Sequence, residues 1–333
     1  MSVRTNPRPK ADGWKKDARL PIFHRMMSMF GVLPPRADEV HKAAPGEKIP
    51  VFSELNQLVH LAPPVFLPFV ARHLYYHYVS HDMGSPWVVW FLMFTYTMLF
   101  GMSSVLYMNR LVRRYGYLDG DVGRDTLPYN LIPKVIFEMV SASMLRPALV
   151  VLACYDPTEV PTLTIWLPVQ LFLLTLTEDF YYYWGHRLCH EAESAWKIHR
   201  LHHTTKHPTT MLLAYADEIQ EVFDIVGAPT LSWLTCPFGF DVTIVWMLVH
   251  LHLQLGGHSG LRLHVGSVLT GPFLRPFGWE LVVEDHDLHH RHGWKDSYNY
   301  GKQSRFWDNL HGSAGDRIEG QGSNLDWNHY VSM

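Results

Sequence analysis

An uncharged run of 23 residues, from Pro86 to Met108, constrains the fold of this chain more than any other feature. As an α-helix the run would reach about 30 Å, the thickness of the hydrocarbon core of a bilayer. Comparable runs follow at 160–177 and 242–261. Weaker runs cover 58–80, interrupted by Arg72; 135–154, interrupted by Glu138 and Arg146; and 225–240, which is short enough to be re-entrant. For any one run the alternative is a buried helix of a soluble core, but together they predict an integral, multi-pass membrane protein.

The basic residues indicate how such helices would be oriented. No Lys or Arg occurs between Lys206 and Arg262. Cytoplasmic loops of membrane proteins carry an excess of Lys and Arg. The segments predicted to be cytoplasmic on this basis are 1–57, 109–134, 186–206 and 262–317. The apolar runs then pair as hairpins, 58–80 with 86–108 and 135–154 with 160–177, while residues 223–261 form a third excursion.

Composition excludes several other classes of protein. The chain has 28 basic and 31 acidic residues, so a binder of nucleic acid is not expected. Its three cysteines form no C-x-x-C pair, which argues against a disulfide framework, a zinc ribbon and a thioredoxin-like site. No apolar run follows the basic start, so no signal peptide is expected, and residues 1–57 are predicted to be an irregular arm with a short helix near Phe23–Phe30.

Histidine is unusually frequent, with 22 residues, and eight of these form three clusters. The clusters are His186 with His190, His199 with His202 and His203, and His286 with His289 and His290. Spacings of three and four residues place side chains on one face of a helix, so the imidazoles of a cluster can reach one metal ion. Eight imidazoles exceed the four ligands of a tetrahedral zinc ion, which indicates two metals. Imidazole also binds iron, copper and nickel, so the ligand type leaves the element open.

These clusters and their surroundings resemble the fatty acid hydroxylase and sterol desaturase superfamily. The resemblance covers about residues 130–315. It rests on Glu178-Asp179-Phe180, Tyr183-Trp184, the three histidine clusters, His258-Ser259-Gly260, Asn299-Tyr300-Gly301, Trp307-Asp308 and Gly312-Ser313. Members of this superfamily are membrane-bound di-iron enzymes that use O2. The resemblance implies that the eight clustered histidines are iron ligands and that His258 is an additional one.

The resemblance also implies an all-α fold, in which membrane hairpins carry a cytoplasmic helical cap that holds the dimetal site. The expected parts are an N-terminal arm (1–57), a first hairpin with its loop (58–134), a catalytic domain (135–315) and a tail (316–333). Carboxylates near the clusters, Asp179, Glu284 and Asp287, are candidates to accept the free ring N–H of ligating histidines. The alternative for each of them is an ordinary exposed charge. Relatives often carry a histidine where this chain has Asp217-Glu218, so the surroundings of the metal are expected to be rebuilt there.

The implied reaction is oxidation of an unactivated C–H bond of a lipid by O2. No G-x-G-x-x-G follows a predicted strand, so electrons from NAD(P)H are expected through a separate donor, such as a b-type cytochrome with its reductase. Sterol 4-methyl oxidation is ranked first because of the His286 cluster and His258-Ser259-Gly260. The segment Leu261–His264 departs from that pattern, and Tyr298–Gly301 is closer to sterol 5-desaturases. The alternatives are therefore 5-desaturation or hydroxylation of a fatty-acyl or sphingolipid chain.

Two further classes remain open at this stage. A zinc-dependent lipid hydrolase would use the same imidazoles with an activated water, and a non-catalytic metal-binding or sterol-sensing protein would use them without turnover. The resemblance places a eukaryotic protein of this kind in the endoplasmic reticulum and a bacterial one in the inner membrane, with the active site on the cytoplasmic side.

Overall fold

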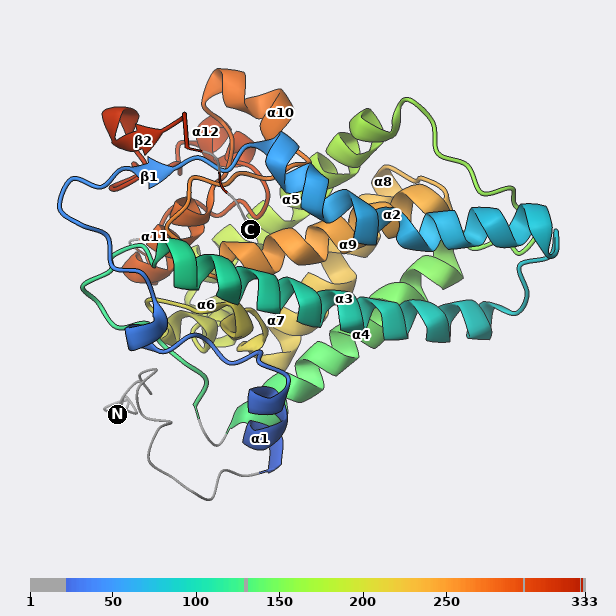
Figure 1. Ribbon diagram of the computed structural model, residues 1–333, viewed down its shortest axis with the longest axis horizontal. Coiled ribbons are helices and arrows are strands. Elements are labelled where there is room, and N and C mark those ends of the chain that lie inside the picture. The colour runs from blue at the N-terminus through green and yellow to red at the C-terminus, as the bar shows by residue number, and fades with distance from the viewer. Residues whose placement is uncertain (1–21, 129–130, 296, 330, 332–333) are drawn as a thin grey trace.

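A computed structural model describes residues 22–128, 131–295, 297–329 and 331. These residues are mainly helical, as predicted, and the long helices run side by side along the molecule (Figure 1). The helices are α1 (Ile22–Met29), α2 (Glu54–Tyr78), α3 (Pro86–Tyr115), α4 (Ile132–Cys154), α5 (Leu167–Glu191), α6 (Glu193–His199), α7 (Glu218–Val222), α8 (Ala228–Thr235), α9 (Phe240–Gly257), α10 (Gly271–Leu274), α11 (Val283–His292) and α12 (Phe306–His311). Two short strands, β1 (Ile49–Pro50) and β2 (Leu325–Asp326), pair in parallel.

Helix α3 contains the uncharged run and begins and ends at clear sequence signals. The side chain of Ser85 accepts a hydrogen bond from the Trp87 backbone N–H at its start. Pro86 occupies the first helical turn, where its missing N–H costs nothing. Gly116 ends the helix with a φ of 84°, a backbone conformation that glycine adopts readily.

Helix α2 remains helical although it contains three prolines. A proline inside a helix leaves the carbonyl four residues earlier without its donor. Pro68 thus frees the carbonyl of Pro64, and the hydroxyl of Tyr96 on α3 donates to that oxygen. The hydrogen bond replaces the missing one and joins α2 to α3.

Helices α3 and α4 are long and apolar enough to cross a membrane. Only 33% and 28% of their most apolar windows are buried within the protein. Large apolar side chains such as Trp87 (75% exposed) and Leu152 (81% exposed) therefore face outward. Exposed apolar side chains along two long helices fit an apolar surrounding.

Helix α9 occupies the centre of the bundle, where α2, α3, α4 and α5 pack against it. Most of its side chains are buried, among them Val245 and Leu248. The run at 242–261 is thus a buried core helix, the alternative considered for any single run. Arg72, which interrupts the run at 58–80, forms a buried ion pair of 2.7 Å with Asp241 at the start of α9. Since α3 packs along α4 and α2 packs on α9, the main packing joins helices from different predicted hairpins.

Two other sequence expectations are corrected or refined. The run at 160–177 is helical only from Leu167 onward. Pro161 has no N–H and disfavours helical backbone in the residue before it, so the chain up to Trp166 is a loop. The short helix expected near Phe23–Phe30 is present as α1, whereas the first 21 residues of the predicted arm lie outside the described part.

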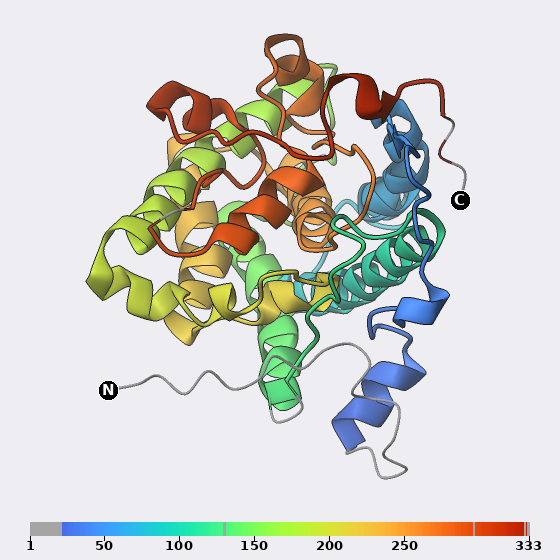
Figure 2. The ribbon, with the colours of Figure 1, turned by 90° about the vertical axis from the view of Figure 1, so that its left-hand side faces the viewer.

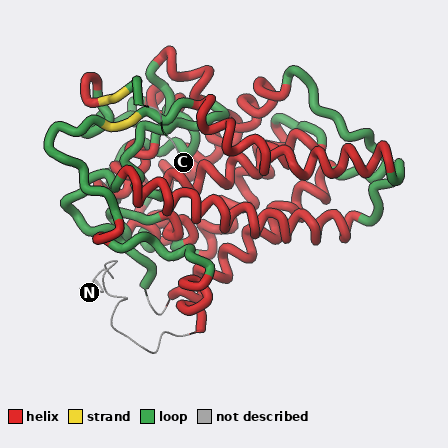
Figure 3. The backbone as a smooth tube through the Cα atoms, in the orientation of Figure 1, coloured by secondary structure: helices red, strands yellow, loops and turns green. Residues whose placement is uncertain are grey.

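The short elements gather at one end of the helix bundle. Loops and both strands lie there, while the opposite end holds the turns between the long helices (Figure 3). In Figure 2 this end faces the viewer. Ile49 of β1 pairs with Leu325 of β2, so the predicted N-terminal arm and C-terminal tail meet at this end. The division of the chain into four parts stays a prediction.

Candidate metal centre

The nine histidines singled out in the sequence converge at the end of the bundle that carries the short elements. Helix α5 extends beyond its apolar part and carries His186 and His190. His199 ends α6, and a single 3-10 turn follows with His202 and His203. Helix α11 supplies His286, His289 and His290, and His258 caps the C-terminus of the central helix α9.

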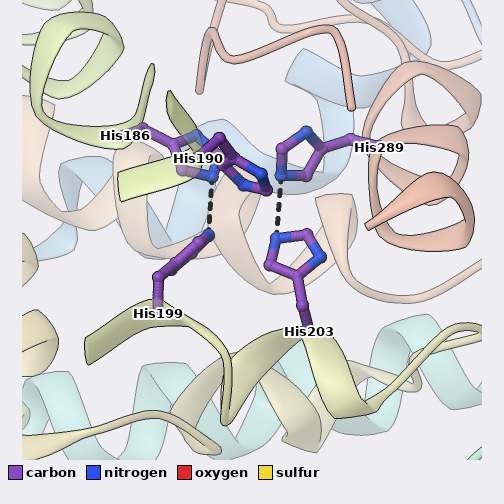
Figure 4. Close-up of side chains that lie close together, drawn as sticks. All are labelled: His186, His190, His199, His203 and His289. Carbon is purple, nitrogen blue, oxygen red and sulfur yellow. Dashed lines mark hydrogen bonds between the residues drawn. The ribbon is translucent and has the colours of Figure 1, made fainter. Parts of the chain in front are cut away.

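The nine imidazoles divide into two groups, and within each group the ligand nitrogens lie within 4.8 Å of one another. Group one consists of His186, His190, His199, His203 and His289. Figure 4 shows these rings converging, with the two from α5 opposite the one from α11 and the other two reaching in from below. Group two consists of His202, His258, His286 and His290. The groups adjoin, because the ring centroids of His203 and His290 are 4.8 Å apart.

Each sequence cluster with adjacent histidines contributes to both groups. The neighbours His202 and His203 face different groups, and their ring planes are 89° apart. The neighbours His289 and His290 do the same, again with ring planes 89° apart. Members four residues apart stay together, as His286 and His290 do. The arrangement therefore places adjacent histidines in different groups and histidines four residues apart in the same group.

In seven of the nine rings an oxygen acceptor fixes which nitrogen carries the proton. A carbonyl oxygen only accepts, so a ring nitrogen bonded to it must carry the proton. His186 Nδ1 lies 2.9 Å from the Tyr300 carbonyl, and His199 Nδ1 lies 2.8 Å from the Gln220 side-chain oxygen. The same pattern joins His190 to Trp294, His202 to Tyr215, His258 to Gln254, His289 to Tyr298 and His290 to Thr205. The Nε2 atom of each of these rings is therefore left unprotonated.

These unprotonated nitrogens face one another at short distance. His186 Nε2 lies 2.9 Å from His199 Nε2, and both rings already donate through Nδ1. In group two His258 Nε2 lies 3.2 Å from His202 Nε2. Two lone pairs at such a distance repel unless a cation lies between them, so the donor set fits a bound metal ion.

Burial keeps the imidazoles neutral, which metal binding requires. Desolvation lowers the pKa of His190 to about 4. It lowers the pKa of His199 and His289 well below the usual value, and their histidine neighbours lower it further. Near neutral pH the site therefore offers uncharged nitrogen ligands without a proton to displace.

The predicted role of the three carboxylates is wrong, because each of them bonds to partners other than histidine. Asp179 accepts from the backbone N–H of Lys302 at 2.6 Å, from that of Gln303 at 3.0 Å and from the Ser304 hydroxyl. Glu284 accepts from three successive backbone N–H groups at 318–320. Asp287 forms ion pairs with Arg124 and Arg291. Asp179 thus holds the segment that follows Tyr300, whose carbonyl lies 2.9 Å from His186 Nδ1.

Sequence reasoning missed the acceptors that the rings use. Most are backbone carbonyls, which leave no mark in a sequence. Gln220 and Ser297 contribute side-chain oxygens, and Gln220 follows the Asp217-Glu218 pair in the sequence. Asp217 caps α7 by accepting from the Ile219 N–H at 3.1 Å, which places Gln220 beside group one.

Several histidines outside the two groups have other partners. His264 lies 3.1 Å from the Glu280 carboxylate, and His252 lies 3.0 Å from the Ser104 hydroxyl. His250 bonds to Gln254, and His311 stacks on Tyr183. Each of these four side chains thus has a partner outside the two groups, and their having no metal stays a prediction.

A cavity of about 70 Å³ reaches group two. Its wall includes His202, His258 and His286 together with apolar side chains of α3 and α9. It shares Phe52, Gln57, Tyr107 and His252 with a larger groove of about 550 Å³ between α2 and α3. Group two is thus reached through a mostly apolar passage that begins between α2 and α3.

Comparison with known proteins adds a family relationship. The fatty acid hydroxylase family model matches residues 171–313, which include all nine histidines. Fatty acid hydroxylase vlmA of Lecanicillium sp is 39% identical over 242 residues, which cover 68% of this chain and 66% of that protein. Methylsterol monooxygenase erg25B of Aspergillus fumigatus is 25% identical over 266 residues, with 72% and 86% covered. Very-long-chain aldehyde decarbonylase GL1-8 of Oryza sativa subsp. indica is 31% identical over 158 residues, with 47% and 55% covered. No solved structure matches the chain.

Proposed function

Because the chain belongs to the fatty acid hydroxylase and sterol desaturase superfamily, we propose that it is a membrane-bound, O2-dependent di-iron oxygenase that oxidises a C–H bond of a lipid. The observation that carries this proposal is the pair of adjoining histidine groups whose inner nitrogens are unprotonated. Group one would hold one iron ion and group two the other. Bound iron supplies the reduction of O2 that an unactivated C–H bond requires.

The residues of the chain hold, orient and shield this chemistry. Backbone carbonyls such as that of Tyr300 fix the ring orientation, as outer-shell partners do in other metal sites. The cavity beside His258 would admit part of an apolar chain, and a bound chain would displace water from beside the metal centre. The groove between α2 and α3 would deliver that chain from the bilayer.

The substrate class we favour is a lipid with an acyl chain. The relative with 39% identity carries the name fatty acid hydroxylase, and the cavity at group two is small, about 70 Å³. Sterol 4-methyl oxidation, ranked first from the motifs alone, is the second candidate. It is supported by the methylsterol monooxygenase of Aspergillus fumigatus, 86% of which is covered.

The proposal includes the surroundings of the enzyme. The outward apolar faces of α3 and α4 would lie in the membrane, and the histidine-bearing end would lie on the cytoplasmic side. Electrons would come from NAD(P)H through a b-type cytochrome and its reductase. Arg110, Arg113 and Arg114 at the end of α3 offer a basic surface for an acidic donor or for anionic lipid.

Metal analysis with oxygen uptake and lipid profiling tests the function. Purified full-length protein should contain iron, and cells that express it should gain an oxidised lipid that is absent with His202→Ala. His41→Ala is the matched control, because this exposed histidine lies outside both groups and pairs with Glu47. Tightly bound zinc together with O2-independent lipid hydrolysis would support the hydrolase instead. An unchanged lipid profile with His202→Ala would contradict the assigned metal site.

A further inference from the structure

Two charged residues inside the apolar helix α4, Glu138 and Arg146, face a second internal cavity of about 70 Å³. Glu221, Asp224 and Lys302 line the same cavity. Ionisable groups inside apolar surroundings are costly, and when several of them share one cavity they commonly mark a route for protons or ions. We call this space the acidic cavity. The proposed lipid oxidation does not account for it.

The acidic cavity is connected to solvent by a chain of ion pairs. Glu138 pairs with Lys134 at 3.0 Å. Lys134 in turn pairs with Glu218 at 2.7 Å, and the side chain of Glu218 is 74% exposed. These contacts link Glu138, which lines the cavity, to a carboxylate at the surface.

The acidic cavity also adjoins the metal centre. Asp224, Gln254 and Lys302 line both this cavity and the one that contains His202 and His258. A buried water needs about 10–15 Å³ and two or more polar partners, so each cavity has room for several waters among these groups. The shared wall is thus polar and hydratable, although apolar helices surround it.

Local structure supports a functional role for this wall. Asp224 lies in a π-helical segment, Phe223–Gly227, a rare conformation that is frequent at functional sites. Burial, together with the carboxylates of Asp224 and Glu138, raises the pKa of Glu221 to about 8 against the opposing effect of Arg146 and Lys134. A carboxyl group of this kind can both hold and release a proton near neutral pH.

We propose that this chain of groups delivers protons from solvent to the metal centre, running through Glu218, Lys134, Glu138, Glu221, Asp224 and Lys302. The inference rests on the proposed function, because hydroxylation consumes protons: R–H + O2 + 2 e⁻ + 2 H⁺ → R–OH + H2O. A desaturation consumes the same two protons and releases two waters. The electrons come from the one-electron donor protein, and the path supplies the matching protons without opening the cavity to bulk water.

Turnover of the full-length, metal-loaded protein in D2O and H2O tests the path. The substrate probe is a total lipid extract of the expressing cells, and product and peroxide are measured per O2 consumed. Glu221→Gln should slow product formation about tenfold or more, raise the solvent isotope effect and release peroxide, with unchanged metal content. Glu221→Asp should restore much of the rate. The matched control Asp241→Asn removes a buried carboxylate of a distant ion pair and should leave coupling unchanged per folded molecule.

A second measurement needs neither metal nor substrate. Infrared spectra of the metal-free protein at pH 7 should contain a protonated carboxyl band that shifts in D2O and is lost in Glu221→Gln. If no lipid is oxidised, the proposed function fails, and an exchanging band still supports the proton path. A band that is absent or does not exchange overturns the path. The path is also overturned if both Glu221→Gln and Glu138→Gln keep the turnover rate and the solvent isotope effect of the wild type.

Discussion

Replacing Asp179 should separate hydrogen bonding from charge in the support of group one. One carboxylate oxygen accepts from the backbone N–H groups of Lys302 and Gln303, and the other accepts from the Ser304 hydroxyl. Asp179→Ala leaves three buried donors without a partner, at about 1–3 kcal/mol each. The summed loss, about 3–9 kcal/mol, is comparable with the whole stability of many domains.

Asp179→Asn should be much milder, because its amide oxygen can keep both backbone N–H groups. Its NH2 group can donate to the Ser304 hydroxyl, which then acts as the acceptor. What remains is the loss of charge assistance, about 1 kcal/mol for each of the three bonds, since such bonds are roughly twice as strong as neutral ones. Chemical or thermal unfolding in detergent measures the difference between the two variants.

The substitutions of Asp179 should also affect metal binding, through one backbone carbonyl. The segment anchored by Asp179 begins next to Tyr300, whose carbonyl accepts from His186 in group one. Asp179→Ala should therefore lower metal occupancy in group one more than in group two. Equal destabilisation by Ala and Asn, or wild-type stability of Asp179→Ala, would refute the reasoning.

Three further predictions follow from the same contacts. His286→Ala should remove one metal per chain because group two has four histidines, whereas His190→Ala should retain more metal because group one has five; elemental analysis of both variants decides. The free energy of unfolding of the metal-free protein should fall as the pH drops from about 6.5 toward 4, because buried His190 stays neutral in the folded state while the unfolded chain takes up a proton. Denaturation midpoints at pH 7.5 and 5 measure this change. A higher midpoint at pH 5 would contradict the prediction. Tyr96→Phe should cost about 1 kcal/mol by freeing the Pro64 carbonyl again, and unchanged unfolding would show that the helix compensates by itself.

Much of the fold could be anticipated from composition along the chain. The uncharged run at 86–108 became α3, and the run at 135–154 became the greater part of α4. The fate of 242–261 could not be anticipated, because an apolar helix is equally suited to lipid and to a protein core. Only the packing of four helices around α9 decided that it is buried.

The hydrogen-bond partners of the carboxylates near the histidines could not be anticipated from the sequence either. Asp179 and Asp287 lie next to ligand-bearing segments in the sequence, yet they bond to Ser304 and Arg124. A carboxylate takes the donors that the fold brings to it, and those donors lie more than a hundred residues away along the chain. Glu138 and Arg146 interrupt the apolar run at 135–154, and the tertiary structure places them at an internal cavity.

The sequence by itself pointed to the eight clustered histidines, because three- and four-residue spacings fix side-chain direction within a helix, and the family resemblance added His258. It also indicated two metals by number alone. Tertiary structure decided how the nine divide, with His202 in group two and His203 in group one. It also decided which nitrogen of each ring faces inward, because the carbonyls that accept the other nitrogen come from distant segments. Local spacing fixes a direction within one helix, but only the packing of α5, α6, α9 and α11 fixes where those directions meet.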